Sequence, residues 1–104
     1  MHARLIEFSG ADSGKREQMI QTIQETVLPM LRTYEGFAGY LALYEEDQRR
    51  AKAILLWETE DAAVAAEDTL KERRRNISGG LGMSIESEDL YEAVIVEFEG
   101  ARIG

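Results

Sequence analysis

The chain has 104 residues, 44% of them hydrophobic, and a formal net charge of −8 at pH 7. This length predicts a single domain over residues 1–104, and the acidic balance argues against nucleic acids and anionic membranes as partners, because both bind clustered lysine and arginine. The sequence contains no cysteine, which excludes disulfides, thiolate catalysis and cysteine-ligated metal centres.

The N-terminal segment runs directly into a strand-like sequence and lacks the apolar stretch of a signal peptide. No apolar run approaches the ~18 residues that a membrane-spanning helix requires. We therefore expect a cytoplasmic protein.

The first predicted elements are a short strand over residues 3–8 and a long amphipathic helix. Apolar side chains recur three or four positions apart from about Lys15 to Tyr34, which is the spacing of one helix face. Ser13, in the turn before this segment, is the predicted N-terminal cap. Pro29 interrupts the pattern and lacks a backbone N–H donor, so we expect the helix to kink or divide there.

Two alternating segments follow, over residues 37–45 and 51–58, and the polar loop between them predicts a hairpin. Alternation sends successive side chains to opposite faces of a sheet. The two segments place Tyr40, Tyr44, Leu55 and Trp57 on one face, and Leu41, Leu43, Ile54 and Leu56 on the other.

Thr59 is the predicted cap of a second helix, which is expected to end near Asn76 before the glycine-rich residues 78–82. The β-branched segment from Leu90 to Phe98 predicts the last strand. The order βαββαβ indicates an α+β, ferredoxin-like fold, with a four-stranded antiparallel sheet and both helices on one of its faces.

Both faces of this sheet are apolar, yet the helices cover only one. A sheet that is apolar on both faces is normally buried on both, and monomers avoid large exposed aliphatic patches. We therefore expect a homodimer with a two-fold interface formed by Leu41, Leu43, Ile54 and Leu56.

Two motifs resemble a known family. Residues 35–40, Glu-Gly-Phe-Ala-Gly-Tyr, are similar to its PGFxGF-type entry into the second strand, with Glu35 in place of proline. Residues 57–62, Trp-Glu-Thr-Glu-Asp-Ala, are similar to its WES-x-x-A junction. The family is the antibiotic biosynthesis monooxygenase-like (ABM) group of the dimeric α/β-barrel superfamily. The resemblance implies a dimer in which the two sheets form an α/β barrel, and it points to cofactor-free oxygenases of aromatic polyketides or to haem-degrading enzymes.

The haem-degrading branch is not supported by the residues. Counted from Trp57, the tryptophan, histidine and asparagine of that branch fall at Ala66, near Arg75 and near Arg4. None of the three matches, and the only histidine of the chain is His2. We therefore predict no haem and no other cofactor.

Three other motifs have ordinary explanations. The segment from Gly10 to Arg16 has three residues between its glycines where a phosphate-binding P-loop has four. The arginines at 73–75 could bind an anionic substrate, although basic residues near the C-terminal end of a helix also interact favourably with the helix dipole. The acidic runs at 45–47 and 86–92 lack the spacing of a calcium loop, so we predict no metal site.

The remaining candidate site is a cleft between sheet and helices, covered by residues 79–83 as a lid. Its candidate ligand-binding residues are Trp57, Tyr40, Phe8, Arg4 and Arg75. The alternative for Trp57 is close packing in the core. The sequence identifies no catalytic residue. Our interpretation is a cofactor-independent, monooxygenase-like protein that acts on or binds a small aromatic molecule, and the alternatives are a non-catalytic binder and a structural homodimer.

Overall fold

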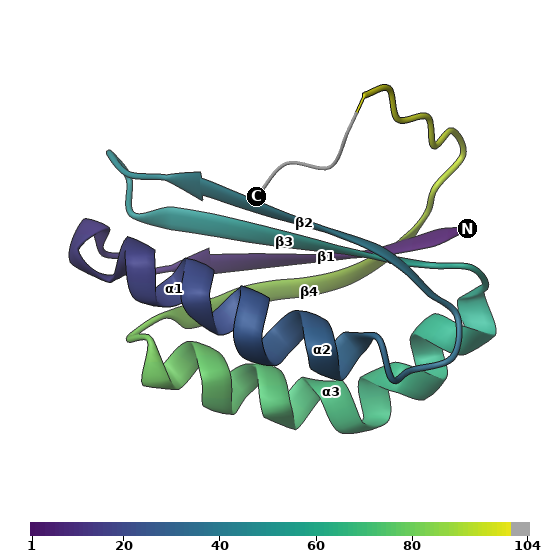
Figure 1. Ribbon diagram of the computed structural model, residues 1–104, viewed down its shortest axis with the longest axis horizontal. Helices are drawn as coiled ribbons and strands as arrows, with labels where there is room; N and C mark the ends of the chain where they lie inside the picture. The colour runs from purple at the N-terminus through teal and green to yellow at the C-terminus, as the bar shows by residue number, and fades with distance from the viewer. Residues whose placement is uncertain (101–104) are drawn as a thin grey trace.

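The computed structural model describes residues 1–100 of the chain (Figure 1). Its elements in chain order are β1 (His2–Ser9), the 3-10 turn η1 (Ser13–Lys15), α1 (Arg16–Thr22), the π-helix η2 (Ile23–Val27), α2 (Leu28–Leu31), β2 (Phe37–Glu45), β3 (Arg50–Trp57), α3 (Glu60–Gly80) and β4 (Ser84–Glu92). The strands form one antiparallel sheet in the order β2-β3-β1-β4. All helices lie on one face of it, as Figure 1 shows, and the predicted ferredoxin-like fold is confirmed. Among the described residues, no helix is both long and apolar enough to span a membrane.

The first helix divides near Pro29, as predicted. A five-residue π-helical turn precedes it, in which the Leu28 N–H donates to the carbonyl of Ile23, five residues earlier. This wider turn changes the hydrogen-bond register just before proline, which cannot donate a bond of its own. The predicted cap was wrong by one residue, because the carboxylate of Asp12 accepts the Gly14 N–H at 3.0 Å and Ser13 begins the turn.

The core lies between the sheet and the helices. Trp57 is 1% exposed and lies there with Leu31 and the small residues Ala63 and Ala66 of α3. Tyr34 and Phe37 contact the Trp57 ring edge-on, at centroid distances of 6.4 and 5.7 Å. Alanine on α3 leaves space for the indole, so this end of the layer is closely packed.

Gly36 joins the two motifs that carry the family resemblance. Its φ of +81° is one that other residues rarely adopt, and a Cβ there would lie 2.6 Å from the Cβ of Ala62. Its carbonyl accepts the Glu58 N–H at 2.8 Å. The end of the first helix is therefore held against the start of α3, which explains why both motifs specify architecture.

The last strand is a correction to the sequence prediction. The predicted strand over 90–98 is replaced by β4 over Ser84–Glu92, and α3 continues to Gly80, past its expected end near Asn76. Register explains the difference, because β4 pairs with β1 up to Glu92↔His2 and β1 begins at His2. Residues 93–100 therefore lie beyond the paired part of the sheet, and they leave it on its helix-free side (Figure 1).

The helix-free face carries the predicted aliphatic set. Leu41 pairs with Ile54 across β2 and β3, and Leu43 and Leu56 lie on the same face. Leu41 and Leu43 are 39% and 44% exposed, whereas Leu56 is only 7% exposed. The helices thus leave an aliphatic surface on the other side of the sheet.

Candidate functional site

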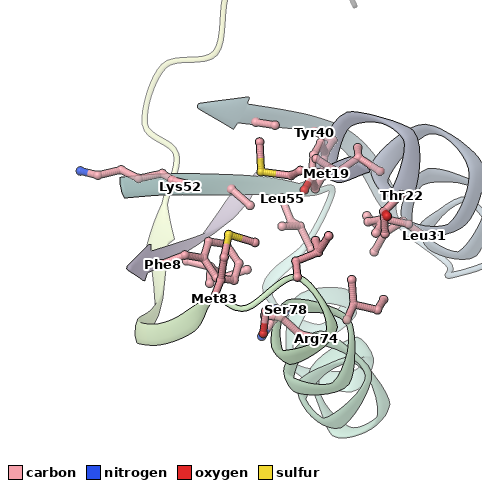
Figure 2. Close-up of a pocket in the computed structure, with 18 of the residues that line it drawn as sticks. Phe8, Met19, Thr22, Leu31, Tyr40, Lys52, Leu55, Arg74, Ser78 and Met83 are labelled. Carbon is pink, nitrogen blue, oxygen red and sulfur yellow. The ribbon is translucent and has the colours of Figure 1, made fainter. Parts of the chain in front are cut away.

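A pocket opens between the inner face of the sheet and the helices, at the end of the layer away from Trp57 (Figure 2). Its cavity volume is about 80 Å³, and most of its wall is apolar, including Phe8 of β1 and Leu55 of β3. An engineered apolar cavity of roughly 150 Å³ is large enough to bind benzene. An aromatic ligand therefore requires the walls of this pocket to move apart.

Methionine side chains make such movement feasible. Met19, Met30 and Met83 all line the pocket, and they come from α1, α2 and the segment before β4. Methionine is unbranched and flexible, and its sulfur makes favourable contacts with aromatic rings. The pocket wall can therefore adapt to a ring with little cost in packing.

Tyr40 supplies one of the polar groups of the pocket. The pleat of β2 directs it to the helix-facing side, opposite Leu55 of β3. Burial raises the pKa of Tyr40 to about 12, and the nearby charge of Arg74 acts more weakly in the opposite direction. The phenol thus stays protonated at neutral pH and can donate a hydrogen bond into the pocket.

Arg74 is the second polar group, and it is held in an ion-pair network. Its guanidinium donates two hydrogen bonds of 2.9 Å to the carboxylate of Glu67, in a bidentate pair. Glu88 of β4 lies 3.7 Å from Arg74, and Arg4 of β1 lies 3.8 Å from Glu67. Two cations and two carboxylates balance here, as charges so little exposed to water require.

Three further polar residues belong to the wall, Thr22, Lys52 and Ser78, and the last two are already engaged elsewhere. Lys52 extends away from the cavity in Figure 2, and its ammonium lies 3.2 Å from Glu7. The Ser78 hydroxyl donates to the carbonyl of Arg75 in its own helix at 3.2 Å. Among the described residues, the wall contains no carboxylate and no histidine.

The structure brings together only some of the residues singled out from the sequence. Phe8 and Tyr40 line the pocket. Arg4 contributes through Glu67 without reaching the wall. Trp57 lies on the helix-facing side, as expected, but in the core and outside the pocket lining.

Arg75 is exposed and does not line the pocket, whereas its neighbour Arg74 does. The sequence held a signal for this difference, since Ala66, Leu70, Arg74 and Ser78 recur at the four-residue spacing of one helix face. The segment expected to act as a lid contributes Leu81 and Met83 to the wall.

A second hollow lies near the other end of the helix layer, bordered by Glu35, Glu58 and Asp61. These three carboxylates are exposed to solvent. Within residues 1–100, no group of three or more acidic or histidine side chains is arranged to hold a metal ion. Within the described residues, this hollow therefore shows no arrangement of side chains that indicates a metal-binding site.

No protein-family model matches the sequence, and no curated protein matches it. Solved structures do match its fold. A candidate antibiotic biosynthesis monooxygenase of Deinococcus radiodurans has a TM-score of 0.70 and 14% identity, over 96% of this chain and all of that one. SnoaB of Streptomyces nogalater, a cofactor-independent oxygenase, has a TM-score of 0.64 and 17% identity, over 94% of this chain and 97% of that one.

A dimeric ferredoxin-like protein from an uncultured marine organism also matches, with a TM-score of 0.66 and 8% identity, over 95% of this chain and all of that one. These identities are low, so what is shared is the architecture. The predicted resemblance to ABM-type proteins is confirmed at the level of the fold.

Proposed function

We propose that this protein binds a small hydroxylated aromatic molecule between the sheet and the helices and oxidises it with O2 without a cofactor. The observation that carries the proposal is an apolar pocket whose wall includes two polar groups, the Tyr40 hydroxyl and the Arg74 guanidinium. Apolar walls with a few well-placed polar groups are typical of small-molecule sites. The cofactor-independent oxygenase of the same fold supports this choice of chemistry.

The pocket restricts the class of substrate. Its wall has no carboxylate or histidine among the described residues, and Tyr40 is too weak an acid to exist as a phenolate base at neutral pH. The substrate must therefore ionise readily by itself. A polycyclic aromatic ketone that forms an enolate fits, because the wall offers it a positive charge, on Arg74, and a hydrogen-bond donor, the Tyr40 hydroxyl.

Without a cofactor, such a substrate supplies all the electrons that O2 receives. A methylene carbon next to the aromatic ketone becomes a carbonyl in a four-electron oxidation. One oxygen atom of O2 enters the new carbonyl, and the other leaves as water with the two methylene hydrogens. Atoms and electrons balance, and excluding bulk water from the apolar pocket strengthens the interaction of Arg74 with the enolate.

Oxygen consumption tests the proposal directly. We expect stoichiometric O2 uptake with at least one member of a panel of hydroxylated polycyclic aromatic ketones, and a strong decrease in the Arg74→Lys and Tyr40→Phe variants. Arg75→Lys is the matched control, since Arg75 lies outside the pocket, and it should behave like the parent protein. Saturable binding without oxygen uptake would replace this proposal with a non-catalytic binder, and the absence of any binding would favour a structural homodimer.

We also propose that the helix-free face forms a homodimer interface through Leu41, Leu43, Ile54 and Leu56. The support is the exposed aliphatic surface on this face and the dimeric protein that shares the fold. Leu41→Glu should shift the protein towards monomer in sedimentation equilibrium, because it places a charge in the interface. Val64→Glu on α3 is the control, since Val64 is also an exposed aliphatic residue but lies on the helix layer.

A further inference from the structure

A buried hydroxyl group near the end of β2 is not used by the proposed reaction. The phenolic oxygen of Tyr44 is enclosed, and it forms no hydrogen bond with any atom of residues 1–100. Buried tyrosine hydroxyls usually find a partner, because an unpaired one gives up its hydration without compensation. The Tyr44 hydroxyl therefore calls for an explanation.

The register of the sheet locates Tyr44 beside the pocket. Alternation along β2 sends Tyr40 and Tyr44 to the same, helix-facing side. Ala51 of β3 lies opposite Tyr44, and Phe8 of β1 lies opposite Ala51 on its other side. Both Ala51 and Phe8 line the pocket. Tyr44 thus borders the pocket from the β2 edge of the sheet.

Alanine forms the floor between the two tyrosines. Ala42 lies between Tyr40 and Tyr44 on β2, and it pairs with Ala53 of β3. Both alanines line the pocket. Tyr40 and Tyr44 are four residues apart, or about 13 Å along the backbone at the usual rise of a strand. A flat ring system that lies on these alanines therefore has one phenol group towards each end.

Widening of the pocket brings a ligand towards Tyr44. The cavity of about 80 Å³ does not include Tyr44 in its wall. An aromatic ring needs more room, roughly 150 Å³ for benzene in an engineered cavity, and it gains room most easily over side chains that are already small. Ala42 and Ala51 are the inward neighbours of Tyr44 along and across the strands. An enlarged pocket can therefore reach the Tyr44 hydroxyl.

The hydroxyl of Tyr44 brings no stability to the free protein. An unpaired buried hydroxyl is unfavourable, whereas an apolar group of the same shape is tolerated or even stabilising. Phenylalanine would fill the same space, so packing alone does not account for tyrosine at this position. A hydrogen bond to a bound molecule does account for it.

We infer that Tyr44 is a second ligand-binding residue, whose hydroxyl forms a hydrogen bond with an oxygen substituent at the end of the aromatic ligand away from Tyr40. The pocket thereby selects ring systems that carry oxygen at both ends, since a site built to hydrogen-bond a hydroxyl discriminates against the analogue that lacks it. The inference rests on the ligand binding proposed above and extends it.

Two ligands and one substitution test the inference by calorimetry. The ligands are a naphthol and a naphthalene with one hydroxyl group on each ring. The parent protein should bind the second ligand at least about fivefold more tightly, the size of effect expected for one hydrogen bond. Tyr44→Phe should remove this difference, with the affinity for the naphthol unchanged. Tyr91→Phe is the matched control, because Tyr91 is exposed and lies outside the pocket, and it should bind both ligands like the parent.

Each other outcome contradicts a different step. If Tyr44→Phe binds both ligands as the parent does, or weakens both equally, the Tyr44 hydroxyl is not a ligand contact, although the pocket still binds aromatic molecules. If the parent binds neither ligand saturably, the proposed function and this inference are both wrong. Urea denaturation provides an independent check, since Tyr44→Phe should be at least as stable as the parent. A clear loss of stability would show that the hydroxyl already has a partner in the free protein.

Discussion

The two ends of the space between sheet and helices differ in the size of the side chains that fill them. At one end, the Trp57 ring is enclosed by Tyr34 and Phe37, is almost fully buried and lines neither of the two hollows. At the other end, the inward positions of β2 and β3 include Ala42, Ala51 and Ala53, and a pocket lies above them.

The difference shows that the pocket arises from small side chains on the sheet rather than from an unusual loop. The pairing of β3 with β2 and β1 is regular at Ala51 and Ala53, and the one register shift between β2 and β3 lies at the other end, between Phe37 and Gly39 opposite Trp57. Replacing a large inward residue with alanine leaves space that the neighbouring helices fill only in part. Stability and binding should therefore be separable, with stability concentrated near Trp57 and binding near Ala53.

The largest effect is expected at the closely packed end. Trp57→Ala should lower the free energy of unfolding by roughly 3–5 kcal/mol, because the site is enclosed and cannot collapse around the smaller residue. Urea denaturation measures the change, with Trp57→Phe as a milder control. A loss below about 1 kcal/mol would show that this end is not the stable part of the molecule.

The ion-pair network should come next. Arg74→Met removes the cation beside Glu88 and leaves Glu67 with Arg4 alone, in a little-exposed site, and should cost about 1–3 kcal/mol. The exposed neighbour provides the control, since Arg75→Met should change stability by no more than about 0.5 kcal/mol. If the two variants lowered the melting temperature equally, the ion-pair network would not hold Arg74 in place, and its role in the site would be wrong.

Filling the pocket should affect binding more than stability. Ala53→Val adds two methyl groups where the wall leaves space, and β-branched residues suit a strand. We expect the protein to gain roughly 0.5–1 kcal/mol of stability, as cavity-filling changes commonly do, and to bind aromatic ligands at least about tenfold more weakly. Unchanged affinity, measured by calorimetry, would place the ligand elsewhere.

The effect of Tyr40 ionisation on stability is absent at neutral pH and appears only in alkaline solution. Its pKa is raised by burial from 10.0 to about 12, so the folded state favours the protonated phenol more than the unfolded state does. This contribution is complete below pH 10 and is lost as the pH rises from 10 towards 12. Tyr40→Phe should therefore flatten the fall in stability over that range, and an unchanged slope would show that the phenol is solvated.

Much of the fold could be predicted because its patterns are local. The alternation of apolar side chains predicted β2 and β3 and the opposite faces on which Leu41 and Trp57 lie. The helical spacing of apolar residues, together with Pro29, predicted the divided first helix. The last strand was misplaced because β4 is an edge strand with polar side chains, while residues 93–98, Ala-Val-Ile-Val-Glu-Phe, have a stronger β composition. Its position depends on where β1 begins, which is a long-range property of register.

The candidate site was predictable only in part, for a similar reason. Tyr40 and Phe8 follow from the alternation of their strands, since inward residues of this sheet face the helices. The inward direction of Arg74 follows from the spacing of buried residues on α3, but its pairing with Glu67 and Glu88 depends on how the helix lies over the sheet. The presence of a cavity depends on packing between elements, which no sequence pattern reports directly.

A methionine NMR titration tests the central claim most directly, because Met19, Met30 and Met83 line the pocket and the remaining methionine, Met1, does not. With 13C-labelled methionine methyl groups and a dihydroxynaphthalene as the ligand, the signals of the three pocket methionines should shift together and saturate. The signal of Met1 should stay in place as the internal control. Saturable binding that leaves all three pocket signals unchanged, or no saturable binding by any hydroxylated aromatic compound tested, would contradict the account.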